Sequence, residues 1–129
     1  MQDELCTFDY ATIRLVPRVE REEFFNVGVI LSCPAHKFLE TRIRLSDAKL
    51  KCFAPETEAE TIRRYLDVIP KICAGAPEAG TIGQLTQRER FYWLTAQRST
   101  IIQSSPVHTG LTNDPAKMLG HLFEKMVNE

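Results

Sequence analysis

The sequence predicts an α+β fold, in which an antiparallel sheet of about four strands has helices packed on one face. Three runs rich in β-branched and aromatic residues, joined by short connections, occupy the first third of the chain. The remainder contains segments with apolar residues at three- and four-residue steps and with helix-capping signals. The expected order is β-β-β-α-α-β-α, and the length of 129 residues fits a single domain spanning residues 1–129.

The first two strands are indicated by composition and alternation. Thr7–Pro17 contains no Gly, is rich in β-branched and aromatic residues, and stops at a proline. A charged connection leads to Phe24–Pro34, where alternate residues form an apolar face that comprises Phe25, Val27, Val29 and Leu31. The opposite face of this strand would then carry Asn26, Gly28 and Ser32.

A third strand is expected in "FLETRIRLS", which follows a turn at "AHK". Its mainly apolar face would comprise Leu39, Thr41, Ile43 and Leu45. Its charged face would comprise Glu40, Arg42 and Arg44. Two short connections between three such runs imply an antiparallel meander. A short helical turn should follow, with Ser46 or Asp47 as its cap.

The clearest helix begins where Thr57 and Glu60 have the spacing of a capping box, in which each side chain satisfies an unpaired backbone N–H of the other residue. The apolar residues that then recur at helical spacing are Ile62, Tyr65, Leu66, Ile69, Ile72 and Cys73. Pro70 predicts that the helix kinks or ends nearby, and Gly75 supplies a stop. The following stretch, "AGAPEAGTIG", is expected to be a loop.

The last third of the chain should contain two helices and a fourth strand. A second capping box at Thr86 and Glu89 predicts a short helix in "QRERFYWLTA". The run "STIIQSS" indicates a strand that is broken at Pro106, and "VHTGLTND" is expected to be a loop. Asp114 and Pro115 then open a final helix, because a proline at the first helical position lacks only an N–H that would be unpaired anyway.

Composition and charge exclude several classes of protein. The net charge of -1 and the pI of about 6.3 provide no overall positive field that would gather nucleic acid or an anionic membrane. The four Cys are widely spaced, so buried or half-buried free thiols are expected rather than a zinc site or a disulfide framework. Neither a signal-peptide pattern nor an apolar run of roughly 18 residues is present, so we expect a cytoplasmic protein, and we expect no cofactor or metal.

Two blocks of the sequence resemble one family. "YATIRLVPRVEREEFFNVGVILSCP" is similar to its N-terminal signature, a strand that ends in Pro followed by an E-F-x-N-V-G-V strand. "RERFYWLTAQRSTIIQSSPVHTGL" resembles its C-terminal signature, and the "LFEKMV" helix follows it. The family is the bacterial domain-of-unknown-function family 3037, and the resemblance covers nearly the whole chain. The resemblance implies no established activity, but members are often encoded beside a kinase-like protein of the HipA type, which implies a two-protein system.

The first candidate site lies in the block between the second capping box and the last helix. In a catalytic interpretation, His108 is the general acid or base, Arg98 clamps an anion, and Ser99 or a neighbouring hydroxyl is the nucleophile. In the structural interpretation, which we favour, the Ser and Thr hydroxyls bond nearby backbone groups. Arg98 then pairs with a carboxylate or bonds the last carbonyls of the preceding helix, and His108 shapes the turn into the final helix.

The polar face of the predicted sheet is a second candidate, as a binding surface. If the three strands turn the same way, one shallow patch contains Tyr10, Arg14, Asn26, Gly28, Arg42 and Arg44. Such a patch could take a phosphate, a carboxylate-bearing peptide or single-stranded nucleic acid. The alternative, which we favour, is a solvated face of the kind usual in antiparallel sheets.

Acidic and aromatic residues supply two weaker candidates. Glu22 and Glu23 could bind a hard cation together with other carboxylates, but no DxD or ExE spacing supports such a metal site. The run from Phe91 to Trp93 cannot form one stacking face, because consecutive helix positions fan out around the axis. At least one of these aromatic rings should be in the core, and an exposed Tyr92 or Trp93 would suit a protein interface.

Two functions follow from these observations. The leading hypothesis is a small non-enzymatic accessory module that binds a partner protein, and the resemblance suggests a kinase-like partner. The alternative is a nucleotide- or nucleic-acid-handling enzyme centred on His108, Arg98 and the arginine-bearing sheet face. The slightly acidic pI and the lack of a phosphate-loop motif disfavour nucleic acid as a partner, and no membrane partner is expected.

Overall fold

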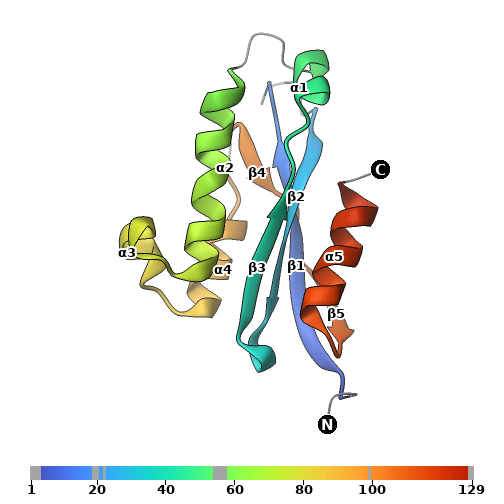
Figure 1. The fold of residues 1–129 in the computed structure, drawn as a ribbon, viewed down its shortest axis with the longest axis vertical. Helices are drawn as coiled ribbons and strands as arrows, with labels where there is room; N and C mark the ends of the chain where they lie inside the picture. Colours follow the sequence, from blue (N-terminus) through green and yellow to red (C-terminus); the bar gives the residue numbers. More distant parts are fainter. Residues whose placement is uncertain (1–3, 19–20, 22, 54–57, 99, 128–129) are drawn as a thin grey trace.

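A computed structural model describes residues 4–18, 21, 23–53, 58–98 and 100–127 of the chain (Figure 1). It confirms the α+β class and shows an antiparallel sheet of five strands rather than about four. The strands are β1 (Cys6–Leu15), β2 (Phe25–Cys33), β3 (Phe38–Ile43), β4 (Ile102–Ser104) and β5 (His108–Thr112). The α-helices are α1 (Asp47–Phe53), α2 (Ala59–Ala74), α3 (Gly80–Gly83), α4 (Gln87–Thr95) and α5 (Pro115–Met126). None of the helices in the described ranges is long and apolar enough to cross a membrane.

The strands follow the order β3-β2-β1-β4, and β5 also pairs with β1. Tyr10 has a partner in β2 and pairs with His108 of β5, whereas Ile13 has a partner in β2 and pairs with Ser104 of β4. Because β2 occupies one edge of β1, β4 and β5 must lie one after the other along its opposite edge. They are two parts of one edge strand, interrupted at Pro106.

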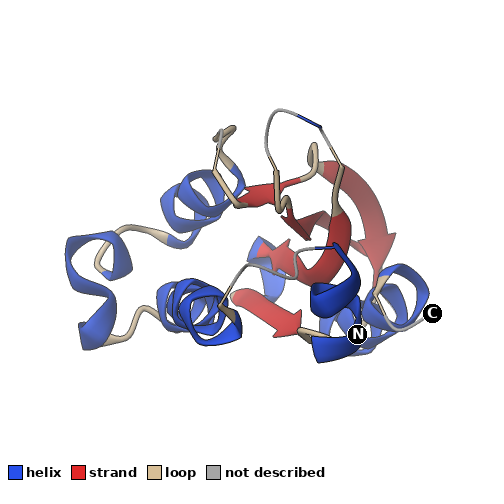
Figure 2. Cartoon of the chain, turned by 90° about the horizontal axis from the view of Figure 1, so that it is seen from above, coloured by secondary structure: helices blue, strands red, loops and turns tan. Residues whose placement is uncertain are grey.

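Helices cover both faces of the sheet, not one face as predicted. In Figures 1 and 2 helices lie on either side of the strands, with α2 and α4 on one side and α5 on the other. The core on the side of α2 includes Ile13, Leu15, Val27, Ile30, Ile62, Leu66, Phe91 and Leu94. The core on the side of α5 includes Phe8, Val29, Leu31, Cys33, Leu119 and Leu122. The sheet is therefore apolar on both faces, which sequence periodicity alone did not indicate.

A β-bulge in β2 corrects the predicted alternation of that strand. Ile13 pairs with Gly28 but Arg14 pairs with Asn26, so Val27 is an extra residue in β2. Val27 consequently belongs to the core under α2, whereas Val29 belongs to the core under α5. The simple period of two predicted one face for both residues, and this was wrong because the extra residue changes the direction of every side chain beyond it.

Glycine at position 28 is explained by close packing at this bulge. A Cβ atom there would lie 2.7 Å from the carbonyl oxygen of Arg42 and 3.0 Å from Cδ1 of Ile13. The backbone oxygen cannot rotate away as the end of a long side chain can. Gly28 therefore allows β2 to lie close to β3 on the face of the sheet that α2 covers. It is not part of an open surface on the opposite face of the sheet.

Most helix-capping predictions are confirmed. Ser46 Oγ accepts a hydrogen bond from the backbone N–H of Lys49 at 3.2 Å, at the start of α1. Helix α2 continues past Pro70 to Ala74, and Gly75 ends it with a φ of 66°. The N-cap position of α2 is Glu58, and the predicted capping residue Thr57 lies outside the described residues.

The caps of the two later helices also agree with the sequence. Thr86 and Glu89 form the reciprocal capping box of α4, with Thr86 N–H donating to Glu89 Oε1 at 3.0 Å. Asp114 Oδ1 accepts from the backbone N–H of Lys117 at 3.1 Å, and Pro115 is the first residue of α5. Local hydrogen-bonding chemistry is thus sufficient to fix where these helices begin.

Two predicted loops are wrong. The stretch 74–83 contains a 3₁₀ turn (Pro77–Ala79) and the short helix α3. The stretch 107–114 contains β5, whose pairing with β1 satisfies backbone groups that a loop would leave to water. A Cβ on Gly110 would lie 2.7 Å from Cζ of Phe8, so this glycine permits close packing of β5 against β1.

All four cysteines are free thiols, in agreement with the prediction. Cys33 and Cys73 are buried and Cys6 is half-buried, but Cys52 on α1 is exposed, which the sequence did not predict. Burial in the core under α2 raises the pKa of the Cys73 thiol to about 12, the nearby Arg90 guanidinium opposing the shift. Cys73 is therefore a packing residue and not a nucleophile at neutral pH.

Candidate binding cavity between α2 and β4

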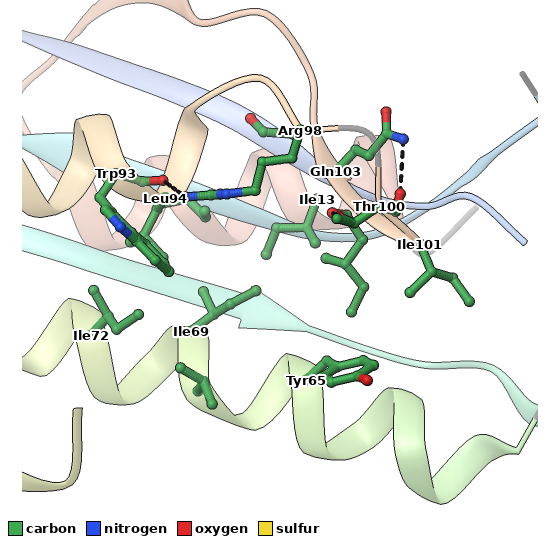
Figure 3. Close-up of a pocket in the computed structure, with 14 residues that line it drawn as sticks. Ile13, Tyr65, Ile69, Ile72, Trp93, Leu94, Arg98, Thr100, Ile101 and Gln103 are labelled. Atoms are coloured by element: carbon green, nitrogen blue, oxygen red, sulfur yellow. Dashed lines mark hydrogen bonds between the residues drawn. The ribbon is translucent and has the colours of Figure 1, made fainter. Parts of the chain in front are cut away.

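A cavity of about 430 Å³ opens between helix α2 and the segment that runs from the end of α4 into β4 (Figure 3). Its floor contains Ile13 and Ile30 of the sheet, which are 2% and 1% exposed. The wall formed by α2 contains Tyr65, Val68, Ile69 and Ile72. The opposite wall contains Trp93, Leu94, Arg98 and residues 100–104. The cavity is therefore an apolar recess that reaches the core of the α2 side.

Large apolar side chains surround the mouth of this cavity and remain exposed to solvent. Tyr65 is 57% exposed, Val68 is 44% exposed and Trp93 is 40% exposed. Figure 3 shows the Trp93 ring on the α4 side, opposite Ile69 and Ile72 of α2. Rings that are half in contact with an apolar recess and half in water are typical of residues that anchor an interface.

Arg98 is the one charged residue among the described residues that line the cavity. Its guanidinium carbon lies 4.3 Å from the centroid of the Trp93 ring, and Nη2 donates a hydrogen bond to the carbonyl oxygen of Trp93. The guanidinium is therefore held in place by a cation–π contact and by a carbonyl at the end of α4. This bond matches the favoured structural interpretation of Arg98, in which it bonds the last carbonyls of the preceding helix.

Hydrogen bonds to the backbone fix the segment that follows Arg98. Thr100 Oγ1 donates to the carbonyl oxygen of Ile102 at 2.6 Å, and Gln103 Nε2 donates to the carbonyl oxygen of Thr100 at 2.8 Å. The backbone N–H of Val16 donates to the carbonyl oxygen of Ile101 at 2.6 Å, which joins this segment to the end of β1. The second wall of the cavity is consequently an ordered turn and a strand attached to the sheet.

The hydroxyls of Ser104 and Ser105 are also engaged with the backbone. Ser105 Oγ accepts from the N–H of Thr12 at 2.9 Å and donates to the carbonyl oxygen of Pro106 at 2.8 Å. Ser104 Oγ donates to the carbonyl oxygen of Ser105 at 2.8 Å. Ser99, the weak candidate nucleophile, lies outside the described residues. The hydroxyls of Thr100, Ser104 and Ser105 therefore bond to backbone groups, as those of Ser and Thr commonly do, and the Thr109 hydroxyl donates to Asp9 Oδ1 at 2.6 Å.

The structure does not bring His108 and Arg98 together. His108 pairs with Tyr10 across β5 and β1, and their ring centroids are 5.3 Å apart. Tyr10 packs against the core under α5, whereas Arg98 lines the cavity on the side of α2. The two residues thus lie on opposite faces of the sheet, and His108 belongs to an exposed edge strand instead of the predicted turn.

The predicted arginine-bearing face is not an open patch, because α5 covers part of it. Asn26 Nδ2 donates to the carbonyl oxygen of Met126 in the last turn of α5 at 3.1 Å. The guanidinium carbon of Arg42 lies 5.8 Å from the Phe123 ring centroid. Arg44 follows the end of β3 and is exposed, and its N–H donates to the carbonyl oxygen of Val27 at 2.7 Å. We expected this face to be solvated because all helices were predicted to pack on the opposite face of the sheet, but α5 packs on this one.

Arg14 and Asn26 of this set remain close together. They are direct partners across β1 and β2, and Arg14 Nε and Asn26 Oδ1 are buried without a hydrogen-bond partner among the described residues. The Arg14 guanidinium carbon lies 4.1 Å from the centroid of the Phe24 ring. Both atoms are buried, so this part of the predicted patch does not form an open surface for a large ligand.

The sequence identified one wall of the cavity and missed the other. Trp93 and Arg98 were singled out as candidates, but Tyr65 was assigned to the buried stripe of α2 and Val68 was not considered. The available signal was a tyrosine in a stripe otherwise made of aliphatic residues and Cys, because an amphipathic ring suits a position that is partly exposed to water.

The acidic pair that was considered for a cation is described only in part. Glu23 forms an ion pair with Arg21 at 2.6 Å, and Glu22 lies outside the described residues.

Comparison with known proteins identifies a family for this fold. No curated protein and no solved structure matches the chain. A family model described as "Protein of unknown function (DUF3037)" matches residues 10–127. This range includes every helix and strand, except that it leaves out the first four residues of β1. Since this match covers far more than half of the sequence, the chain belongs to the DUF3037 family.

Proposed function

We propose that the protein is a non-enzymatic interaction module, and that the cavity between α2 and β4 docks a segment of a partner protein. One observation carries the proposal: an apolar recess of about 430 Å³ whose mouth is lined by the exposed side chains of Tyr65, Val68 and Trp93. Its volume falls within the range of about 300–1,000 Å³ that is usual for binding pockets. A partner side chain in this recess would remove both the rim and the floor from water.

The chemistry of the lining supports binding more than catalysis. Trp, Tyr and Arg are the residue types that most often contribute large binding energies at protein interfaces, and Trp93, Tyr65 and Arg98 supply one of each. The described polar groups of the lining are held by the backbone, as Thr100 and Gln103 show. Groups fixed in this way form a rigid surface, which lowers the entropy lost when a partner binds.

The partner to test first is the kinase-like protein suggested by the gene neighbourhood of the family that the chain resembles. The two proteins should be expressed together, and association should be measured by size-exclusion chromatography and by titration of the purified components. We expect a complex that Tyr65→Ala weakens by about 30-fold, which corresponds to about 2 kcal/mol, the threshold of an interface hot spot.

Tyr92→Ala is the matched control for Tyr65→Ala. Tyr92 is 56% exposed and Tyr65 is 57% exposed, but only Tyr65 lines the cavity. Tyr92→Ala should therefore leave the affinity unchanged. A complex that tolerates the combined substitution of Tyr65 and Val68 would contradict the proposal. It would also be contradicted if the two proteins neither associate nor alter each other's activity.

A further inference from the structure

We infer that the docked segment carries a large apolar side chain beside a carboxylate, the apolar group entering the cavity and the carboxylate binding Arg98. This inference rests on the proposed function, because it specifies the chemistry of the segment that the same cavity takes. It follows from three properties of the site: the apolar floor, the sign of its charge and the way in which Arg98 is held.

The floor of the cavity and the aliphatic residues around it favour an apolar group. Ile13 and Ile30 form the bottom, and Ile69, Ile72 and Leu94 surround it. Ile72 is 1% exposed and Leu94 is 7% exposed, so the recess reaches side chains that are otherwise fully packed. A polar group placed there would lose its hydrogen bonds to water without replacement, whereas a Leu, Met or Phe side chain would be stabilised by burial.

The charge at the mouth of the cavity is positive and is not balanced locally. No acidic residue is among the described residues of the lining. Elsewhere on the surface, Arg63 pairs with Asp47 at 2.8 Å and Arg21 pairs with Glu23 at 2.6 Å. Among the described residues Arg98 has no such carboxylate partner, and it is bonded only to the Trp93 carbonyl and ring.

The position of Arg98 suits recognition of a carboxylate from outside the chain. A guanidinium has five N–H donors, and the described bond to Trp93 uses one of them. Stacking on Trp93 keeps the planar group beside the apolar recess and limits its rotation. A carboxylate a short distance from the buried apolar side chain would accept charge-assisted hydrogen bonds that a neutral amide cannot match.

The test uses a library of random linear peptides selected on the immobilised full-length protein, with counter-selection on the Tyr65→Ala variant. We expect the enriched peptides to share a Leu, Ile, Met or Phe with an Asp or Glu nearby in the sequence. Synthetic versions can be titrated by the fluorescence of Trp93, which is the single Trp of the chain and lines the cavity. Replacing the acidic residue of the peptide by its amide should weaken binding about tenfold.

Variants of the protein separate charge recognition from structural damage. Arg98→Gln should remove the preference for the acidic peptide over its amide, and Arg98→Lys should retain part of it because the charge remains. Arg88→Gln is the matched control, since Arg88 is also held by an aromatic residue of α4, through hydrogen bonds to the Tyr92 hydroxyl, but does not line the cavity. Added salt should weaken acidic-peptide binding to the wild type but not to Arg98→Gln.

The outcomes distinguish this inference from the proposed function. Enriched peptides that are apolar without acidic residues, or that bind Arg98→Gln as well as the wild type, would overturn the carboxylate while leaving the docking site in place. Peptides that bind the wild type and Tyr65→Ala equally would overturn the docking site itself. Decanoate serves as a small-molecule probe: if it quenches Trp93 while no peptide is enriched, the cavity takes a small amphipathic ligand and both proposals fail.

Discussion

The two faces of the sheet are both apolar, yet they are covered in different ways. On one face α5 packs along β2 and β3, and Leu31, Leu119 and Leu122 are 0%, 3% and 7% exposed. On the other face α2 packs chiefly against β3 and leaves a recess toward β4, where Tyr65 is 57% exposed. Apolar side chains on the α5 face therefore stabilise the fold, whereas those at the mouth of the recess remain exposed and can contact a partner.

The largest expected effect comes from removing a core side chain on the α5 face. Leu31 is fully buried in β2 and belongs to the cluster that packs under α5. Leu31→Ala should lower the free energy of unfolding by about 2–5 kcal/mol, because it loses buried apolar surface and leaves a cavity. Urea denaturation followed by circular dichroism would measure this. A loss below about 1 kcal/mol would contradict the tight packing of the α5 face.

A smaller loss is expected at the bulge that separates the two faces. Gly28→Ala places a Cβ 2.7 Å from the carbonyl oxygen of Arg42, so strands β2 and β3 must move apart. We expect a destabilisation of about 1–3 kcal/mol, the usual range for overpacking. The free energy of unfolding from urea titration is again the measurement, and a stabilised variant would contradict the role of Gly28 at the bulge.

Gly120→Ala is the matched control for this substitution. Its added Cβ would lie 3.3 Å from Nη1 of Arg42, which is the end of a flexible side chain that can shift. Gly120 is in the interior of α5, where alanine favours the helix by about 0.5–1 kcal/mol. A neutral or slightly stabilised Gly120→Ala variant beside a destabilised Gly28→Ala variant would attribute the damage to the rigid backbone contact.

The bulge also explains how much of the fold the sequence could predict. Local chemistry identified the first three strands, the capping box at Thr86 and the start of α5 at Asp114, because a few neighbouring residues determine each of these features. The sequence could not show that Val27 and Val29 point to opposite faces, since this depends on pairing with β1. Without that register, the sequence cannot show how the helices are distributed over the two faces of the sheet.

The cavity shows the same limit for the candidate site. Trp93 and Arg98 lie close together in the sequence, so their grouping was visible before the fold. Tyr65 lies on a different helix, and its helical spacing matched that of residues that are buried. Whether a position in an apolar stripe is covered depends on the distance between α2 and β4, which is a property of tertiary packing.

The wall formed by α4 should depend on its own cap. Thr86→Ala removes the two bonds made by Thr86 Oγ1, one from the backbone N–H of Glu89 and one to the Glu89 carboxylate, and keeps the bond that the backbone N–H of residue 86 donates. The substitution should destabilise the protein by about 1 kcal/mol. The bonds that Thr86 donates hold the pKa of the Glu89 carboxyl below its ordinary value, the backbone N–H contributing most. Because the folded pKa is the lower one, this contribution is present above the unfolded pKa and is lost as the pH falls through the folded value.

The pH dependence gives this prediction a separate readout. Urea denaturation at neutral pH and at a series of acidic pH values should show that the wild type loses part of its advantage over Thr86→Ala as Glu89 becomes protonated. The part that is lost comes from the bond between Thr86 Oγ1 and the Glu89 carboxylate, because the larger backbone contribution is present in both proteins. An equal difference between the two proteins at neutral pH and below the lowered pKa would show that the cap stabilises α4 without the Glu89 charge.

The smallest expected effect on stability comes from the rim of the recess. Tyr65 projects from α2 and is 57% exposed, so Tyr65→Ala removes few packed contacts and should change the free energy of unfolding by no more than about 0.5 kcal/mol. The same measurement on Leu31→Ala defines the opposite extreme. A loss above about 2 kcal/mol for Tyr65→Ala would place its ring in the core and remove the basis for treating the recess as a docking site. A stable variant that no longer binds would mean that the two faces differ in purpose as well as in packing, because the apolar surface retained on the α2 face would then serve a partner and not the fold.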